Sequence, residues 1–179
     1  MSVGGHVFVA RKASGMPTSS PWSVSVINPL LGSETFDSVS PVILAPGQSV
    51  EAPTMTITYV SGTGDMGIQD VSWTGGMLPD PGKIEGHVLH IGRSGNTGAK
   101  VVRLELKGEC SSVSFYQYYS SALKNYATYY NRAGVLLGTK YLESSFSSSL
   151  HSFSASGIAR IELHTSAQEW VRLDHFTFS

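Results

Sequence analysis

The chain has little of what several large classes of protein need. It contains a single cysteine, Cys110, in 179 residues, which excludes an intrachain disulfide framework. Charged residues make up 14% of the chain and the net charge is −1. Without a basic run to neutralise phosphates, a nucleic-acid partner is not expected. No apolar stretch approaches the roughly 20 residues of a membrane span, so no transmembrane segment is expected either.

Catalytic and metal-binding motifs are equally scarce. The segment 62–67 reads G-x-G-x-x-G, but strand-like residues follow it instead of a helix, so we interpret it as a hairpin loop. His87 and His90 are three apart on a predicted strand and face opposite ways, so they cannot share a zinc ion. Glu105 and Glu162 lie on polar strand faces without the paired carboxylate that a glycosidase needs. We therefore expect no enzyme, and a sandwich-fold hydrolase is only a third candidate.

Short strands and turns dominate what is present. Val102, Leu104 and Leu106 alternate with charged residues, the pattern of a strand with one buried and one solvated face. Glycine (19 residues) and proline–glycine turns separate such runs. The predicted strands are 54–60, 67–73, 87–91, 101–107, 112–119, 126–130, 135–141, 157–164 and 171–178. This spacing predicts an all-β, antiparallel two-sheet β-sandwich of about eight to ten strands.

The end of the chain predicts a closing strand. Its alternation places Trp170, Arg172, Asp174, Phe176 and Phe178 on one face. Because the two phenylalanines belong in a core, Asp174 is expected in the same inner layer. A buried carboxylate is costly unless it is hydrogen-bonded, paired or bound to a metal ion.

Several segments together resemble a known family. They are Val113-Ser114-Phe115, residues 127–138 (ATYYNRAGVLLG), residues 153–163 (FSASGIARIEL) and residues 173–178 (LDHFTF). They look like bacterial jelly-roll domains of the galactose-binding-like and carbohydrate-binding-module-like type, and the opening SETFD at 33–37 is similar to the start of those domains. The resemblance covers residues 33–179, so residues 1–32 would form an N-terminal extension that could add a strand.

The resemblance also implies a cofactor. In such folds the opening and closing acids often share a structural calcium ion, and here Asp174 with Asp37 or Glu34 would supply the side-chain ligands. Calcium takes six to eight oxygens, and His175 stands where the family usually has a second acid. The alternative is that Asp174 is hydrogen-bonded to the backbone or to a neighbouring arginine.

Tyrosines are the strongest indication of a binding surface. If Val113 and Phe115 point inward, Tyr116 and Tyr118 point outward, and the same reasoning turns Tyr126 and Tyr130 outward. Exposed tyrosines can stack on a sugar ring or on a partner protein. The alternative is that the rings cover the sheet or pack under the N-terminal extension. The candidate ligand-binding residues are Tyr116, Tyr118, Tyr126, Tyr130, Trp73, Asn131 and Arg132.

These observations predict a non-catalytic carbohydrate-binding, lectin-like module of a bacterial secreted or surface protein. The alternative is a structural or protein-interaction β-sandwich domain, such as an adhesin, toxin or appendage component, that binds a protein partner. Residues 1–10 lack the basic start and long apolar core of a signal peptide, so we expect either export by another route or an excised domain or mature form. The sequence leaves the glycan, the partner and the oligomeric state open.

Overall fold

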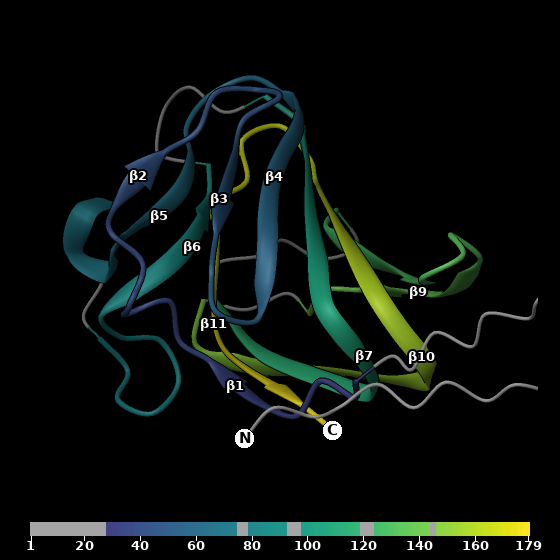
Figure 1. Ribbon diagram of the computed structural model, residues 1–179. Coiled ribbons are helices and arrows are strands. Elements are labelled where there is room, and N and C mark those ends of the chain that lie inside the picture. Colours follow the sequence, from purple (N-terminus) through teal and green to yellow (C-terminus); the bar gives the residue numbers. More distant parts are fainter. Residues whose placement is uncertain (1–27, 75–78, 93–97, 119–123, 144–145) are drawn as a thin grey trace, which may run out of the picture.

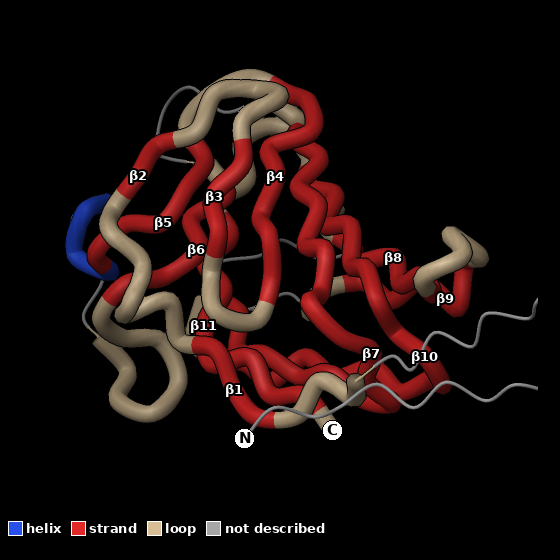
Figure 2. The backbone as a smooth tube through the Cα atoms, viewed as in Figure 1, coloured by secondary structure: helices blue, strands red, loops and turns tan. Residues whose placement is uncertain are grey.

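The computed structural model describes residues 28–74, 79–92, 98–118, 124–143 and 146–179. Every strand pair in this part of the chain is antiparallel, and its one helix is a 3-10 turn, η1 (Val71–Thr74) (Figure 2). None of the helices in the described ranges is long and apolar enough to cross a membrane. The predicted all-β antiparallel sandwich is confirmed, with eleven strands in place of eight to ten.

The strands are named in chain order in Figure 1. They are β1 (Gly32–Glu34), β2 (Val42–Ile43), β3 (Ser49–Glu51), β4 (Met55–Gly62), β5 (Met66–Asp70), β6 (His87–Ile91), β7 (Lys100–Tyr118), β8 (Tyr126–Asn131), β9 (Leu136–Tyr141), β10 (Ser149–Thr165) and β11 (Val171–Phe178).

Two long strands, β7 and β10, connect the two layers of the sandwich. They pair with each other along most of their length and bend together at the lower end of the view in Figure 1. One layer, sheet A, has the order β3-β4-β7-β10-β8-β9, and the other, sheet B, has the order β2-β5-β6-β11-β7-β10. Residues 100–106 of β7 belong to sheet A and residues 113–118 to sheet B.

The bend in these strands has a local cause. The N–H groups of Ser111 and Ser112 both donate to the carbonyl oxygen of Ser179, at 2.6 and 2.8 Å. The opposing strand is irregular at the same level, where its register against β7 shifts between Ser154 and Ile158 and Gly157 has a φ of 75°. Irregular pairing of this kind bends a strand and increases its twist.

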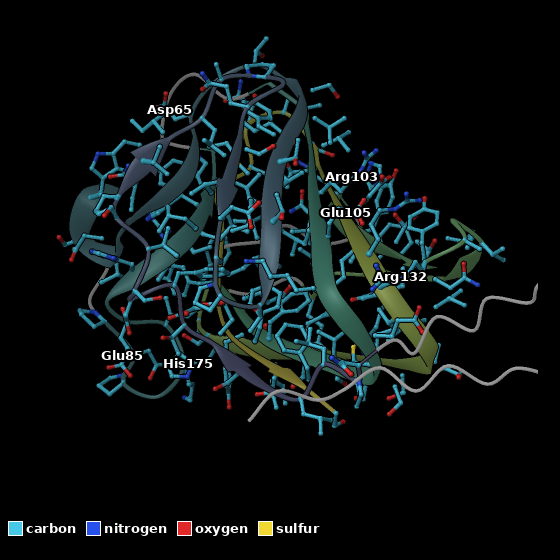
Figure 3. All side chains as sticks on the ribbon, viewed as in Figure 1. Asp65, Glu85, Arg103, Glu105, Arg132 and His175 are labelled. Atoms are coloured by element: carbon cyan, nitrogen blue, oxygen red, sulfur yellow. The ribbon has the colours of Figure 1, made fainter. Side chains whose placement is uncertain are left out.

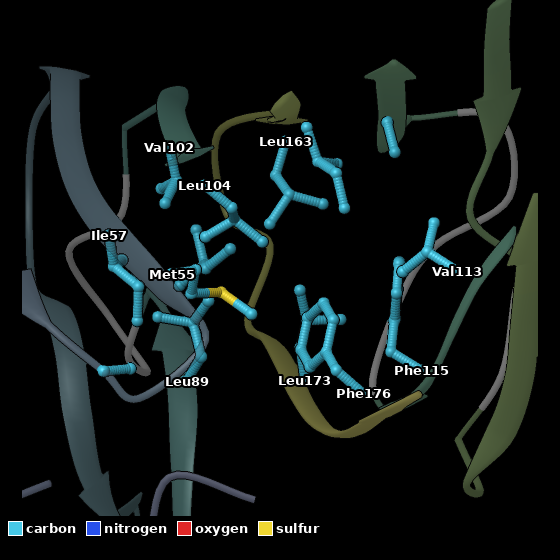
Figure 4. Close-up of a cluster of buried hydrophobic side chains, with 14 of the residues drawn as sticks. Met55, Ile57, Leu89, Val102, Leu104, Val113, Phe115, Leu163, Leu173 and Phe176 are labelled. Atoms are coloured by element: carbon cyan, nitrogen blue, oxygen red, sulfur yellow. The ribbon is translucent and has the colours of Figure 1, made fainter. Parts of the chain in front are cut away.

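The core lies between sheets A and B. Met55, Ile57 and Leu104 from sheet A meet Leu89 and Leu173 from sheet B (Figure 4). All five residues are fully buried. Phe115 and Phe176 stack with their ring centroids 4.7 Å apart. Burial of each such side chain contributes about 1.5–3 kcal/mol, so this cluster is the main source of the fold's stability.

The closing strand is confirmed, but its side chains occupy other faces of the sheet than predicted. His175 has a φ of 48°, and the register of β11 against β7 shifts between Asp174 and Thr177. The extra residue reverses the alternation, so Leu173 and Phe176 both enter the core. Asp174 therefore lies on the outer face of sheet B, and the expectation that it shares the layer of the phenylalanines was wrong. It is still fully buried, because the segment before β6 covers it.

The boundary of the predicted N-terminal extension can be described only in part. β1 begins at Gly32 and pairs with the end of β11. Just before it, Pro29 forms an isolated bridge with Glu109, and the Leu30 N–H donates to the Glu109 carbonyl oxygen at 2.7 Å. Residues 1–27 lie outside the described residues, so the added strand stays a prediction.

Candidate functional site

A pocket of about 310 Å³ opens at one end of sheet A. It lies where β4 and β10 end and β7 and β8 begin, because the antiparallel register brings Gly62, Lys100 and Thr165 level with one another. The volume is at the lower end of the range of about 300–1,000 Å³ for small-molecule sites. The lining residues are Ser61, Ala99, Lys100, Val101, Lys124, Tyr126, His164, Thr165 and Ser166.

A stacked pair of rings forms the planar part of this lining. Tyr126 and His164 are cross-strand neighbours whose ring centroids are 4.5 Å apart, with an angle of 10° between the planes. The edge of Tyr141 on β9 supports Tyr126 at 5.7 Å. Burial lowers the pKa of His164, while Glu162 acts in the opposite direction. The imidazole is therefore neutral at pH 7 and, like the phenol, offers a flat and mostly apolar surface.

Hydrogen bonds fix the polar rim of the pocket. The Ser166 hydroxyl donates to the Lys124 carbonyl oxygen at 2.9 Å, and the Ser166 N–H donates to Asn125 Oδ1 at 3.1 Å. The buried Asn125 amide in turn donates to the buried Glu169 carboxylate at 2.9 Å. Lys124 Nζ lies 3.8 Å from the same carboxylate. This network holds the start of β8 against the end of β10, so the rim is set before any ligand arrives.

Two polar side chains are buried at the same end of sheet A, behind the pocket. Lys100 is 2% exposed, and its ammonium group donates to the Gly98 carbonyl oxygen at 3.0 Å. Burial lowers the pKa of Lys100, and the charge of Asp65 partly offsets this. Thr165, opposite Lys100 on β10, is 5% exposed and its hydroxyl has no hydrogen-bond partner. Both side chains lie on the core-facing side of sheet A with Val102 and Leu163, whereas Tyr126 and His164 lie on its outer face.

The turn between β4 and β5 closes one side of the site. Gly62 has a φ of 130°, and a Cβ there would lie 2.3 Å from the Ala99 carbonyl oxygen. The buried Tyr59 anchors the same turn, since its hydroxyl donates to the Gly64 carbonyl oxygen at 3.2 Å. The segment that matches G-x-G-x-x-G is therefore a tight hairpin, as predicted, and the backbone approach of β4 to β7 requires its first glycine.

The predicted binding residues do not gather in one place. Tyr126 lines the pocket, whereas Tyr130 lies further along the same face of β8, with the Arg160 guanidinium 4.2 Å from its ring centroid. Asn131 Oδ1 accepts a hydrogen bond from the Val135 N–H within the β8–β9 turn. Arg132 pairs with Glu109 at 3.3 Å. Figure 3 shows Arg132 on the same side of the molecule as Arg103 and Glu105.

The other predicted aromatic residues lie on the outer face of sheet B. Tyr116 and Tyr118 are half-buried and pack against Val71, Ile84 and Val88. The Arg172 guanidinium lies 5.7 Å from the Tyr118 ring centroid. Trp73 contacts the buried His90 edge-on at 5.5 Å. Their role in ligand binding stays a prediction, and their packing contacts support the alternative that they cover the sheet.

An acidic corner surrounds Asp174. Its carboxylate accepts hydrogen bonds from the N–H groups of His175 at 2.7 Å and Glu85 at 3.1 Å. Burial is the main cause that raises the pKa of Asp174 to about 7, and the charges of Asp37 and Glu85 add to it. Glu85 also lies 3.5 Å from the His175 ring, and both are labelled at the lower left of Figure 3.

The predicted calcium ligands are engaged in other ways in this corner. Glu34 accepts from the Phe36 N–H and from the Thr54 N–H and hydroxyl. Asp37 accepts from the His87 N–H at 2.9 Å. Across the described residues, no three His, Cys, Asp or Glu side chains are placed to hold a metal ion. These side chains alone fall short of six to eight oxygens, so backbone carbonyls and water would have to complete a site, and calcium stays a prediction.

Sequence reasoning missed most of the pocket. One signal for Lys100 was available: it continues the inward alternation of Val102 and Leu104, where a charged residue is unexpected. Ser61, Lys124 and Ser166 carry no such signal, because ordinary loop residues become a rim only when distant strand ends meet.

Comparison with known proteins supports the fold. No family model and no curated protein matches the sequence. Similar solved structures include the K2 cleaved adhesin domain of Lys-gingipain (8% identity, TM-score 0.50, covering 83% of this chain and 98% of that one). They also include the K1 cleaved adhesin domain from Porphyromonas gingivalis W83 (11%, 0.51, 84% and 98%) and CsCBM6-3 from Clostridium stercorarium in complex with cellobiose (19%, 0.40, 74% and 92%). The likeness to the adhesin domains confirms a shared β-sandwich fold.

Proposed function

We propose that the protein is a non-catalytic carbohydrate-binding module and that the pocket at the end of sheet A is its sugar site. The observation that carries this proposal is the stacked Tyr126–His164 pair beside the hydroxyl groups of Ser61 and Ser166 and the Lys124 ammonium group, in a pocket of about 310 Å³. A sugar ring has apolar C–H faces and a rim of hydroxyl groups. Such a ligand needs planar apolar surface together with a few positioned polar groups.

The size of the pocket limits the ligand. A volume at the lower end of the usual range fits a single sugar residue or the end of a chain rather than a long glycan. Ser61, Lys124 and Ser166 form the rim. Ser61 and Lys124 can donate to ring hydroxyl groups, and Ser166, whose proton goes to the Lys124 carbonyl oxygen, can accept from one. Because hydrogen bonds hold the start of β8 to the end of β10, little ordering is needed on binding.

The test compares two tyrosines on the same face of one strand. Glycan-array screening followed by titration calorimetry should find a ligand whose affinity falls about tenfold or more in Tyr126→Ala, which is about 1.4 kcal/mol. Tyr130→Ala is the matched control, because Tyr130 lies outside the pocket, and its affinity should stay within about twofold of wild type. Melting curves establish that both variants are folded.

Other results would contradict this assignment. Loss of glycan binding in Tyr116→Ala or Tyr118→Ala, with Tyr126→Ala unchanged, would place the site on the outer face of sheet B. Silence of the wild-type protein across a diverse array would refute carbohydrate binding.

A protein-interaction domain is the second candidate, and one observation favours it. The β8–β9 hairpin exposes Val135 (58%), Leu136 (55%) and Tyr141 (50%) beside β9, which is an edge strand. Apolar side chains next to an open edge suit pairing with another protein. Light scattering after size exclusion, with Leu136→Lys as the variant, would reveal self-association through this edge. An extracellular or cell-surface location belongs to both candidates and is part of the proposal.

A further inference from the structure

Two side chains that line the pocket already donate their protons within the protein. His164 and Ser166 lie two residues apart at the end of β10, and both line the pocket on the outer side of sheet A. Thr165 between them is buried on the core side, as the alternation of a strand requires. A side chain whose proton is already donated offers a ligand only its lone pairs.

Ser166 is the simpler case. Its hydroxyl group has one proton, which it donates to the Lys124 carbonyl oxygen at 2.9 Å. Its N–H donates to Asn125 Oδ1 at 3.1 Å, so the main chain is held in place beside the pocket. Toward a ligand, Ser166 Oγ is therefore a hydrogen-bond acceptor.

His164 is in the same state because of Thr128. The Thr128 hydroxyl donates its one proton to the Glu162 carbonyl oxygen at 3.3 Å, and its oxygen lies 3.4 Å from His164 Nε2. Since Thr128 has no second proton to give, the neutral imidazole carries its proton on Nε2 and donates it to Thr128. The two ring nitrogens point in nearly opposite directions, and Thr128 lies toward the middle of the sheet. Nδ1 therefore faces the open end of the sheet as an acceptor.

We propose that His164 Nδ1 and Ser166 Oγ are two fixed acceptors that select a sugar through two of its hydroxyl groups. This inference rests on the proposed carbohydrate-binding function and names the ligand groups that the pocket recognises. A deoxy or O-methyl sugar leaves one acceptor without a donor, and a site built to bond a hydroxyl group rejects an analogue that lacks it. The ligand is an uncharged, hydroxyl-rich sugar, because a carboxylate has no proton to donate to these acceptors.

Protonation of His164 removes one of the two acceptors, because an imidazolium carries a proton on both nitrogens. Burial lowers the pKa of His164, and the charge of Glu162 acts in the opposite direction. The charged and titratable side chains around the ring and on the strands beside it are Arg103, Lys124, Tyr126, Tyr141, Glu162 and Glu169. Affinity for the sugar should fall by about tenfold for each pH unit below the pKa of His164.

The tautomer of His164 is tested first, without a ligand. NMR of ¹⁵N-labelled protein at neutral pH distinguishes the two neutral tautomers by their nitrogen shifts and should show the proton on Nε2. Thr128→Val removes the oxygen that accepts this proton, so the other tautomer should appear. Thr128→Ser keeps the oxygen and should behave as wild type. A wild-type imidazole with its proton on Nδ1 would overturn the inference.

Titration calorimetry then locates the two hydroxyl groups. The probes are methyl glucoside, methyl galactoside, methyl mannoside and the terminal sugar of any glycan-array ligand, each with its monodeoxy and mono-O-methyl analogues. For a sugar that binds, removal of either of two hydroxyl groups should weaken binding by about fivefold to tenfold. Removal of any other hydroxyl group should have a smaller effect.

Variants assign each hydroxyl group to its acceptor. His164→Phe keeps a ring against Tyr126 but has no nitrogen, so one of the two losses should disappear and affinity should no longer depend on pH between about pH 8 and pH 5. Ser166→Ala should remove the other loss. His87→Gln is the matched control, because His87 lies on β6 in sheet B, and it should keep both losses and the pH profile. If His164→Phe does not fold, Thr128→Val beside Thr128→Ser supplies the comparison.

The outcomes separate this inference from the proposed function. Equal affinity for the parent sugar and all its deoxy analogues would overturn the inference, and so would a pH profile unchanged in His164→Phe. In either case the carbohydrate-binding function stands if Tyr126→Ala still weakens binding. If no sugar binds and a glycan array is silent, the proposed function fails and this inference fails with it.

Discussion

Acidification should destabilise this fold through two buried histidines, and one of them can be isolated by substitution. His151 is 1% exposed, is stacked on Phe115 at 4.7 Å and lies 2.7 Å from the Tyr129 hydroxyl. Burial, helped by the charge of Lys140, lowers the pKa of His151 from 6.5 to about 4. Burial likewise lowers the pKa of His90 to about 3. Both rings are neutral in the folded protein at pH 7.

The sign of the effect follows from which state binds the proton. Below pH 6.5 the unfolded chain takes up protons on both histidines while the folded protein does not. The contribution of the two neutral histidines to the free energy of unfolding is therefore fully present above pH 6.5 and is lost as the pH falls. Each pH unit is worth about 1.4 kcal/mol per group. His151 therefore accounts for a loss of about 3 kcal/mol between pH 6.5 and about 4.

Asp174 has the opposite effect on the free energy of unfolding over much of the same pH range. Its pKa is raised to about 7, so the folded protein takes up this proton before the unfolded chain does, and stability rises as the pH falls. His90 and His151 against one aspartate leave a net of one proton, and His164, whose pKa burial also lowers, adds to it. Between about pH 6 and pH 4.5 the free energy of unfolding should fall by at least about 1.4 kcal/mol per pH unit.

The assay is urea unfolding of wild type and His151→Gln at several pH values in that interval. Glutamine keeps a polar partner for the Tyr129 hydroxyl but does not titrate, so the slope should be smaller than that of wild type by about 1.4 kcal/mol per pH unit, even though the variant is less stable at pH 7. Tyr129→Phe is the control, because it breaks the same contact without removing the histidine, and its slope should equal that of wild type. An unchanged slope in His151→Gln would refute the reasoning.

Two further predictions concern the acidic corner and the turn beside the pocket. After treatment with EDTA, added calcium should raise the melting temperature of wild type, by an amount equivalent to about 3 kcal/mol at a hundredfold excess over Kd, but not that of Asp174→Asn; an unchanged wild type would rule the ion out. Gly62→Ala should lower the free energy of unfolding by about 2–3 kcal/mol, since its Cβ would meet the Ala99 carbonyl oxygen. Gly47 has a φ of 87° but open space around it, so Gly47→Ala should lower the free energy of unfolding by only about 1 kcal/mol. Equal losses in the two variants would contradict the steric argument.

The sequence determined the architecture through local physics. Alternation such as that of Val102, Leu104 and Leu106 is visible without coordinates because side chains of a strand point to opposite faces. Glycine and proline–glycine turns showed where strands end. Low charge and the pattern of short strands were enough to predict an antiparallel sandwich. The serine-rich segment that begins β10 was missed, because its polar residues hide the alternation around His151 and Phe153.

Tertiary structure alone decided which face of a sheet each side chain of a strand occupies and which residues line the pocket. A bulge at His175 reversed the facing of Asp174, and an alternating pattern cannot show where a partner strand will force an extra residue. Residues 101–107 and 112–119 were predicted as two strands, but Lys100–Tyr118 form one bent strand that both sheets share. Val101, Tyr126 and His164 line one pocket only because β7, β8 and β10 align in register at one end of a sheet. Such contacts join residues far apart in the chain, so long-range pairing and not local pattern creates the site.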